Sequence, residues 1–170
     1  MSDNIEVMWE GRFITAKREG KWEYVSRSRG IKAAVILAID AGHVLLVEQY
    51  RVPLGKNCIE LPAGLVGDHD DNAEEDSAIA AIRELEEETG YRAEIMENCG
   101  EYYSSPGMVS ESFSLFKASG LTKVSEGGGV DGENITVHRV ALSELSKFIE
   151  SKRQEGAGID VKLMMFLQLA

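Results

Sequence analysis

Residues 72–91 read NAEEDSAIAAIRELEEETGY, and the rest of the chain can be placed around this stretch. The spacing predicts one amphipathic helix that stops at Gly90, where a left-handed cap suits glycine. We expect Asn72 to be the N-cap, with negative charge in the first turn from Glu74, Glu75 and Asp76. The narrow apolar face that would pack on the rest of the protein consists of Ala78, Ala81, Ile82 and Leu85.

Three carboxylates lie on the outward side of this predicted helix. Glu84, Glu87 and Glu88 are spaced i, i+3 and i+4, which stacks them within about one turn. Like charges so placed repel one another by roughly 0.2–0.5 kcal/mol per pair. A bound divalent cation offsets this repulsion, because hard cations such as Mg²⁺ take oxygen ligands. The alternative is an ordinary acidic surface helix, since glutamate is a strong helix former.

The string RELEEETGY at residues 83–91 resembles the core of the Nudix hydrolase signature. In that signature Arg-Glu, an aliphatic residue, any residue, Glu-Glu, any residue and Gly follow one another. The further glutamate that the signature places eight residues before the arginine is present as Glu75. His69 stands where the signature expects a glycine, and the nearest suitable upstream glycine is Gly64. We therefore expect an insertion within residues 67–72, whose polar turn residues suit a surface loop.

The resemblance implies a metal site and a reaction class. The implied metal ligands are the backbone carbonyl of Ala63 and the side chains of Glu84, Glu87 and Glu88. Mg²⁺ is the expected ion, with Mn²⁺ as the alternative. Metal ions beside a diphosphate can neutralise its charge, orient an attacking water and stabilise the leaving oxygen. The reaction class is then hydrolysis of a phosphoanhydride.

A general base is also needed near the attacking water. The glycine-rich loop of residues 125–134 precedes a predicted strand, and we expect it to be mobile. Its position resembles the place where ADP-ribose pyrophosphatases carry a catalytic acidic residue. In order of preference the candidates are Glu133, Asp131 and Glu126, and Glu111 is a further candidate for a metal or water contact. The expected catalytic residues are Glu133, Glu87 and Arg83, of which Arg83 would orient a neighbouring carboxylate or form only a surface salt bridge.

A second marker narrows the substrate. Ser105-Pro106-Gly107 resembles the Ser-Pro-Gly marker of ADP-ribose pyrophosphatases, and an ordinary turn is the alternative interpretation. Residues 22–27, 48–51 and 60–65 resemble the same subfamily, including its mammalian ADP-sugar members. The substrate-binding residues implied by this resemblance are Trp22, Glu23, Arg27, Arg51, Leu65, Pro106 and Gly107.

The resemblance also implies what several of these residues do. Trp22 would stack on adenine, as a flat indole can, and Glu23 would accept a hydrogen bond from its exocyclic amine. Arg27 and Arg51 would hold the diphosphate, which a guanidinium can grip with two hydrogen bonds. The alternatives are an interface aromatic and two surface arginines.

Composition limits the classes of protein to consider. The chain has 170 residues, enough for one domain with a sizeable core, and a formal charge of −11. That charge argues against a nucleic-acid backbone as partner, since such binding rests on Lys and Arg. Cys58 and Cys99 form no spacing motif, and we expect reduced thiols rather than a disulfide. No signal peptide and no apolar run of membrane-spanning length is visible, so we expect a cytoplasmic protein without a membrane partner.

The hydrophobic pattern predicts an α+β fold with a mixed sheet. Residues 1–30 are expected to form a small antiparallel β meander, and residues 31–170 the main domain. In the main domain, strands are expected at 31–39, 44–47, 58–61, 93–96, 100–103, 112–118 and 135–141, with helices at 143–152, capped by Ser143, and 161–169. The resemblance implies the same architecture, a Nudix-type α/β/α sandwich.

The supposed base-binding residues lie in the meander, whereas the metal ligands lie in the main domain. In the subfamily that the chain resembles, a homodimer closes this gap, so we expect a homodimer. The expected reaction is Mg²⁺-dependent hydrolysis of ADP-ribose or another ADP-sugar to AMP and a sugar phosphate. The alternatives are a broader nucleoside diphosphate sugar hydrolase, for instance one acting on GDP-mannose, and an ADP-ribose sensor without activity.

Overall fold

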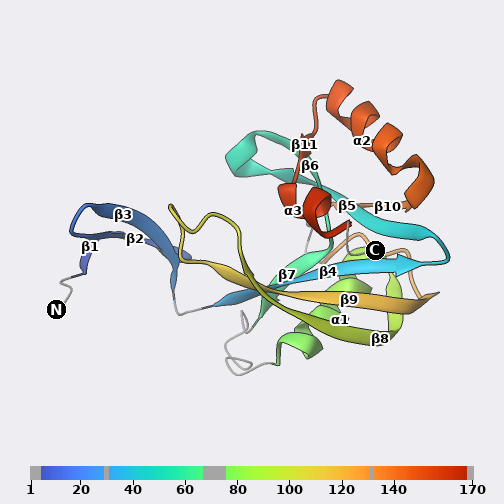
Figure 1. The fold of residues 1–170 in the computed structure, drawn as a ribbon, viewed down its shortest axis with the longest axis horizontal. Coiled ribbons are helices and arrows are strands. Elements are labelled where there is room, and N and C mark those ends of the chain that lie inside the picture. The colour runs from blue at the N-terminus through green and yellow to red at the C-terminus, as the bar shows by residue number, and fades with distance from the viewer. Residues whose placement is uncertain (1–4, 29–30, 67–75, 131, 168–170) are drawn as a thin grey trace.

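The computed structural model describes residues 5–28, 31–66, 76–130 and 132–167. These residues form a three-stranded antiparallel sheet and an eight-stranded mixed sheet with helices on both faces (Figure 1). The expected α+β sandwich with a separate small sheet is therefore confirmed. No helix in the described part of the chain is long and apolar enough to cross a bilayer.

The small sheet is the expected meander, and it projects from one end of the main body (Figure 1). Its strands are β1 (Glu6–Glu10), β2 (Ile14–Glu19) and β3 (Trp22–Arg27). The amide of Val25 donates to the carbonyl of Met108 (2.9 Å), and the amide of Ser110 donates to the carbonyl of Val25 (3.0 Å). The loop before β9 therefore continues the meander's edge and joins it to the main body.

The strands of the large sheet are β4 (Lys32–Asp40), β5 (His43–Arg51), β6 (Lys56–Glu60), β7 (Ala63–Val66), β8 (Tyr91–Tyr103), β9 (Ser112–Lys123), β10 (Thr136–Ala141) and β11 (Gly158–Ile159). Their order is β11-β6-β5-β4-β9-β8, with β10 paired to β5 and β7 paired to β4. The pairs β4–β9 and β6–β11 are parallel, which makes the sheet mixed. The strands expected at 93–96 and 100–103 are one strand, β8, with a register shift between Asn98 and Glu101.

The hairpin of β4 and β5 opens soon after its turn. Ala41 and Gly42 both have positive φ, as a two-residue hairpin turn of the primed type requires. The two strands pair only at Ile39–Val44 and Asp40–His43. Beyond those pairs β4 continues against β7, and β5 continues against β6 and β10. The separation of β4 from β5 leaves a gap between the two strands, where a cleft can form.

Two cores lie on opposite faces of the large sheet. Helix α1 (Ser77–Thr89) buries Ala81 and Leu85 against Ile36 and Phe116 on one face. Helices α2 (Leu145–Gln154) and α3 (Val161–Phe166) cover the other face, where Leu37 is buried. Neighbouring residues of β4 thus enter different cores, because side chains alternate along a strand. The helices consequently hold β4 on both sides.

Three local expectations were wrong. Helix α1 begins at Ser77, because the side chain of Asp76 accepts a hydrogen bond from the amide of Ala78 (2.7 Å) and acts as the N-cap. The expected cap Asn72, like Glu74, Glu75, His69 and the inserted loop, lies outside the described residues. Short 3-10 helices form at Val52–Leu54 and at Leu142–Glu144, and the second carries the chain into α2 without a cap from Ser143. The predicted strands did not include residues 63–66, which form strand β7 because they pair with β4.

Candidate active site

A cleft of about 430 Å³ lies where β4 and β5 diverge, between β7 and the end of α1. It brings together residues that are far apart in the sequence. Those predicted for the site that line the cleft are Arg27, Arg51, Ala63, Leu65, Glu84, Glu88 and Glu133. Gly64 and the lower-ranked candidate Glu111 line it as well.

Glu88 lies inside the cleft wall and not on an outward face. Its residue is only 5% exposed, on the same side of α1 as Ala81 and Leu85. The amide of Ala63 donates to Oε2 of Glu88 (3.0 Å). Burial raises the pKa of Glu88 from 4.5 to about 8. The hydrogen bond from the Ala63 amide lowers this pKa, and the charges of Glu84 and Glu133 raise it. The expectation that all three glutamates face outward was therefore wrong for Glu88.

Gly64 makes room for the second carboxylate. A Cβ atom at Gly64 would lie 1.9 Å from Cδ and 2.2 Å from Oε1 of Glu84, so no larger residue fits while Glu84 keeps this position. The close approach of the β7 backbone to the helix therefore depends on glycine, as expected for this position.

Arg83 connects the two remaining carboxylates. Its Nη1 lies 2.9 Å from Oε1 of Glu84 and 3.0 Å from Oε2 of Glu87, and its Nη2 donates to the carbonyl of Leu65 (3.5 Å). Arg83 is therefore more than a helix-surface salt bridge, because it also reaches β7. The carboxylate of Glu87 points to Arg83 and does not line the cleft.

The donor set suits a hard divalent cation. Within the ranges that the structure describes, no three acidic, histidine or cysteine side chains already converge as a metal cluster. Burial of Glu88 beside two other carboxylates is nevertheless unfavourable without a cation, as its raised pKa shows. The nearby oxygens belong to carboxylates, which Mg²⁺ prefers. The residues present thus fit the ion that the sequence implies.

The glycine-rich loop is attached to the end of α1. The amides of Gly128 and Gly129 donate to the carbonyls of Glu88 (2.9 Å) and Glu87 (3.0 Å), which have no partner within the helix. A Cβ atom at Gly127 would lie 2.4 Å from the carbonyl carbon of Thr89. The loop therefore docks on the backbone that carries the glutamates.

This docking places Glu133 in the cleft. Its Oε2 accepts a hydrogen bond from the amide of Val130 (3.0 Å), and its charge contributes to the raised pKa of Glu88. Glu126 is different, because its side chain is 91% exposed, pairs with Lys123 and does not line the cleft. Asp131 lies outside the described residues. Of the two described acids in this loop, Glu133 lines the cleft and Glu126 does not.

Both predicted arginines in the cleft are held by carboxylates. Nε and Nη2 of Arg51 donate to the two carboxylate oxygens of Glu60, at 2.6 and 3.0 Å. Arg27 of the meander pairs with Glu111 of the main body. The hydrogen bonds that Arg51 donates to Glu60 raise the pKa of Arg51, so its guanidinium stays charged. These ion pairs fix one edge of each guanidinium group and leave other N–H groups for a ligand.

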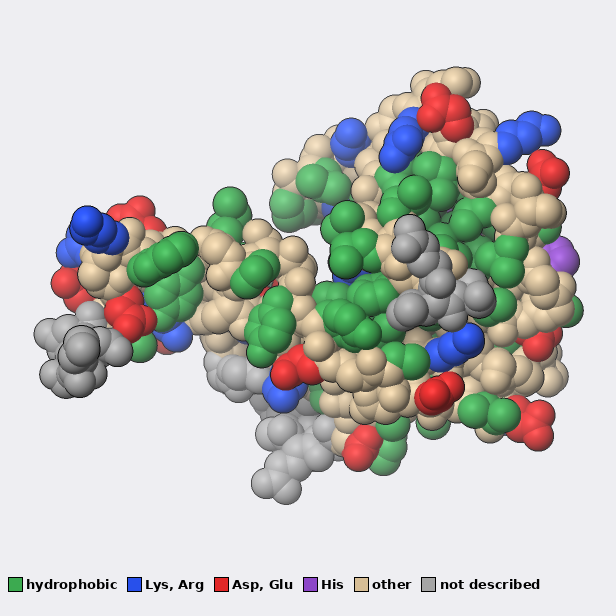
Figure 2. All heavy atoms as spheres, viewed as in Figure 1, with side chains coloured by type: hydrophobic (Ala, Val, Ile, Leu, Met, Phe, Trp, Pro, Cys, Tyr) green, Lys and Arg blue, Asp and Glu red, His purple; other side chains and the backbone are tan. Residues whose placement is uncertain are grey.

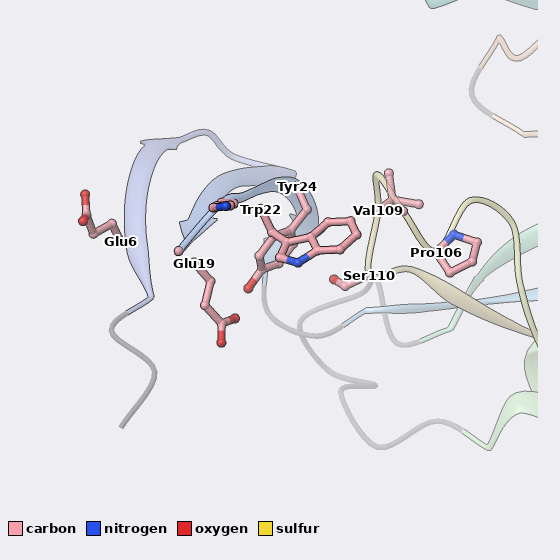
Figure 3. Close-up of a pocket in the computed structure, with 10 residues that line it drawn as sticks. Glu6, Glu19, Trp22, Tyr24, Pro106, Val109 and Ser110 are labelled. Carbon is pink, nitrogen blue, oxygen red and sulfur yellow. The ribbon is translucent and has the colours of Figure 1, made fainter. Parts of the chain in front are cut away.

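Trp22 lies apart from this cleft, in a groove between the meander and the loop of residues 104–110. Trp22 is 66% exposed. Figure 3 shows the indole of Trp22 extended toward Ser110, with Pro106 on the neighbouring loop. Pro106 and Gly107 line the same groove as Trp22, whereas the exposed Glu23 does not. Within one chain the predicted base-binding residues therefore lie apart from the predicted phosphate-binding residues.

Sequence reasoning missed two charged residues of the cleft, Glu60 and Lys162. Glu60 belongs to a stretch that resembles the subfamily, and its place at the end of a buried strand was the available signal. Lys162 comes from α3, and no motif in the sequence connects it to the helix with the glutamates. Its place in the cleft depends on the tertiary fold.

Comparison with known proteins identifies related sequences. The sequence model of the NUDIX domain matches residues 29–158. A methanol dehydrogenase activator of Bacillus methanolicus is 38% identical over 140 residues, which cover 82% of this chain and 70% of the relative. An ADP-ribose pyrophosphatase of Bacillus subtilis is 35% identical over 120 residues, which cover 70% of this chain and 62% of the relative.

Two further comparisons cover more of the chain. A GDP-mannose pyrophosphatase of Cronobacter sakazakii is 33% identical over 180 aligned residues, which cover 99% of this chain and 89% of the relative. The crystal structure of an ADP compounds hydrolase superposes with a TM-score of 0.69 at 22% identity and covers 86% of this chain and 80% of that chain. At this identity the structural likeness supports the fold alone.

Proposed function

The chain belongs to the NUDIX domain family, and on that premise we propose that it hydrolyses the diphosphate of ADP-ribose and other ADP-sugars to AMP and a sugar phosphate. It is a hydrolase that acts on phosphoanhydrides. The observation that carries the proposal is the cleft, which is lined both by the carboxylates of Glu84, Glu88 and Glu133 and by Arg27 and Arg51. Carboxylates for a cation and guanidinium groups for phosphate are the two things a bound diphosphate requires.

Glu84 and Glu88 would hold the divalent cation, together with Glu87 and the carbonyl of Ala63. Mg²⁺ is our first choice and Mn²⁺ the second. When bound, such an ion supplies charge neutralisation of the diphosphate and orients a water for attack. Arg83 positions this set, because it contacts the carboxylates of both Glu84 and Glu87.

Arg51 and Arg27 would bind the phosphates. A guanidinium group has five N–H donors, and the two hydrogen bonds to Glu60 leave three of those of Arg51 for phosphate oxygens. Glu60 and Glu111 orient the arginines before the substrate arrives, which lowers the entropy that binding would cost. Leu65 contributes an apolar part of the cleft wall.

Glu133 would accept the proton of the attacking water. It lies in the cleft with Glu84 and Glu88, and the Val130 amide holds one of its oxygens. The other oxygen can take the proton, as a general base requires. Glu111, which pairs with Arg27, is the alternative base.

Trp22, Glu23, Pro106 and Gly107 would bind adenine, and we propose that a homodimer brings this groove to the cleft of the other subunit. The meander supports this view because large apolar side chains lie exposed on it, among them Val7, Trp9, Phe13 and Ile14. Figure 2 shows hydrophobic side chains on the surface of the projecting meander. Exposed apolar side chains that gather on one surface mark protein–protein interaction sites.

Mixed dimers test this arrangement. Trp22→Ala and Glu84→Gln subunits, each with little activity alone, are mixed and allowed to exchange. If one subunit's meander serves the other's cleft, the mixed dimer contains one intact composite site and activity returns. If each subunit uses its own meander, mixing restores nothing and the shared site is disproved.

GDP-mannose hydrolysis is the second candidate. The relative from Cronobacter sakazakii that bears this name aligns with almost the whole chain, including the meander. The phosphate and metal chemistry would be the same, and only the base and sugar contacts would differ. Base recognition by few contacts makes a broad preference feasible.

A hydrolysis panel decides between these functions. ADP-ribose, ADP-glucose, GDP-mannose, UDP-glucose and NADH are each tested with Mg²⁺ and with a chelator. A clear preference for ADP-ribose supports the main proposal, and a preference for GDP-mannose supports the second. Tight ADP-ribose binding without cleavage of any compound would indicate a sensor.

We also propose a cytoplasmic location and no nucleic-acid or membrane partner. Both cysteines are free thiols, as is usual in reducing compartments. The charge of −11 opposes binding to phosphate backbones or anionic lipid surfaces. Fractionation of cells that produce the tagged protein tests the location.

A further inference from the structure

We propose that Lys162 contacts the sugar-side phosphate of the substrate and so completes the cleft from the C-terminal end of the chain. This inference rests on the proposed function, because it concerns the half of a nucleotide sugar that leaves as a sugar phosphate. It assigns a binding role to a residue of α3, outside the segment that matches the family.

The first observation is the place of Lys162. It lines the same cleft as Arg51, Glu84 and Glu133, and its side chain is 22% exposed. Its Nζ pairs with Asp160 and lies 5.9 Å from the centre of the Phe113 ring, which also lines the cleft. The ammonium group is therefore held near the cleft and not extended into solvent.

The second observation is the anchoring of α3. Strand β11 pairs with β6 in parallel, and the amide of Asp160 donates to the carbonyl of Ile59 (3.0 Å). Leu163 and Phe166 are buried in the core that α3 shares with β4. The Phe166 ring meets Tyr102 edge to face at 4.9 Å between ring centres. The backbone at Lys162 is thus fixed by packing, and the side chain alone needs to adjust to a ligand.

The third observation concerns charge. Among the described residues, the cations that line the cleft are Arg27, Arg51 and Lys162. Each arginine is paired with a carboxylate that also lines the cleft, namely Glu111 or Glu60. Asp160, the partner of Lys162, is not part of the lining. Lys162 therefore adds positive charge that no cleft carboxylate neutralises.

The position of Lys162 outside the segment that matches the family indicates which half of the substrate it contacts. The NUDIX domain model matches residues 29–158. Nucleotide-sugar substrates share the diphosphate and differ in the base and the sugar. Of the cleft residues, Arg27 and Lys162 lie outside this range. We assigned Arg27, together with Arg51, to the diphosphate. The sugar side remains for Lys162, whose compact ammonium group suits a phosphate oxygen.

Product binding separates the two halves of the substrate without turnover. AMP and ribose 5-phosphate are titrated separately into the wild type, Lys162→Met and Lys162→Arg, and binding is measured by calorimetry. Methionine keeps the length and apolar packing of lysine but removes the charge. Lys147→Met is the matched control, because Lys147 is an exposed lysine of α2 that does not line the cleft.

We expect Lys162→Met to weaken ribose 5-phosphate binding by about tenfold and AMP binding by less than about twofold. We expect Lys162→Arg to retain most of the ribose 5-phosphate affinity. In turnover, Lys162→Met should raise KM for ADP-ribose by about tenfold with kcat changed by less than about threefold, as loss of uniform binding requires. Lys147→Met should match the wild type in each measurement.

Unchanged ribose 5-phosphate binding in Lys162→Met would overturn the inference and leave Lys162 as the partner of Asp160 only. Equal weakening of AMP and ribose 5-phosphate would overturn the assignment to the sugar side. Failure of the proposed function gives a different result, because the wild type would then not hydrolyse ADP-ribose. Thermal unfolding of each variant establishes that α3 stays packed when the affinity changes.

Discussion

Gly64 lies against the carboxyl group of Glu84, and a Cβ atom at Gly64 would be 1.9 Å from Cδ of that glutamate. The contact joins strand β7, which follows Pro62, to the helix that carries the acidic residues. Only the end of a flexible side chain stands in the way of a methyl group, so the carboxylate and not the backbone would move. The pair therefore offers a way to displace Glu84 without removing it.

Gly64→Ala should abolish most activity while the fold persists. Displacement of the Glu84 carboxylate from the cleft should lower kcat with Mg²⁺ by about 10²-fold or more, since a misplaced group costs nearly as much as a missing one. The free energy of unfolding should change by less than about 1 kcal/mol, because alanine fits the strand. Steady-state kinetics and urea unfolding measure the two effects.

The double variant Gly64→Ala/Glu84→Gln isolates the cause. If alanine acts only through Glu84, the double variant should be no less active than Glu84→Gln alone. Multiplication of the two single effects would show that Gly64→Ala disturbs something else in the cleft.

Removal of the buried charge at Glu88 should separate stability from activity. Glu88→Gln keeps an oxygen that can accept from the Ala63 amide, and it removes a carboxylate that burial disfavours. Without divalent cation, the variant should be as stable as the wild type or more stable at neutral pH. Turnover with Mg²⁺ should fall by about 10²-fold or more, since a ligand of the ion is lost.

Metal addition provides the complementary measurement. Mg²⁺ should raise the melting temperature of the wild type, because a ligand of the native state stabilises that state. The rise in melting temperature on addition of Mg²⁺ should be much smaller in Glu88→Gln. An equal gain in both proteins would remove Glu88 from the metal site.

Local patterns in the sequence were sufficient for much of the fold. Gly90 ends α1 with φ of 74°, as expected from its place after the last apolar turn. The run of Ala, Val and Ile at residues 31–39 predicted a strand, and the positive φ at Ala41 and Gly42 accounts for the turn that follows. Such signals need only the residue and its near neighbours.

The face of α1 that packs on the sheet could not be predicted from such local signals. Ile82 was expected on the packed face but is 43% exposed, whereas Glu88 is buried. Glu88 can be buried because the Ala63 amide from another strand donates to it. Arg51–Glu60 and Lys162 likewise depend on where distant strands and α3 meet. Contacts of this kind arise from the tertiary arrangement, which hydrophobic periodicity does not report.

The docked glycine loop should control the position of Glu133. Gly127→Ala would place a Cβ atom 2.4 Å from the backbone of Thr89 and strain a residue whose φ is +66°. The loop must then move away from the end of α1, and Glu133 moves with it. We expect kcat to fall by about tenfold or more with a smaller change in KM, as for loss of a positioned base.

Gly132→Ala is the matched control for this loop. Gly132 also has a positive φ, of +84°, but no atom lies within 4 Å of its Cβ position. Its substitution adds similar backbone strain without a collision. Equal loss of activity in both variants would show that strain, and not contact with α1, explains the effect.

Glu48 should make the fold sensitive to acid through a cluster away from the cleft. Its carboxylate on β5 accepts hydrogen bonds from Asn57, His138 and Lys152, each at 2.9 Å. Burial alone would raise the pKa of Glu48, but the hydrogen bonds outweigh it and lower the pKa from 4.5 to about 2. Because the folded pKa lies below the unfolded one, the stabilisation is complete above pH 4.5 and is lost as pH falls toward 2.

Glu48→Gln should therefore reduce the free energy of unfolding by about 1–2 kcal/mol at pH 7, less than the full shift would give because solvent screens part of the cluster. Urea unfolding of the wild type and of Glu48→Gln between pH 7 and pH 2 measures the difference in their free energies of unfolding. The titration of all other carboxylates affects both proteins equally and cancels from this difference. The difference should stay constant down to about pH 5 and then shrink toward zero. Glu144→Gln, at an exposed glutamate 3.9 Å from Lys147, should show no such pH-dependent difference. A constant difference for Glu48→Gln across the whole range would mean that its charge does not stabilise the fold and that the hydrogen bonds act equally well with a neutral partner.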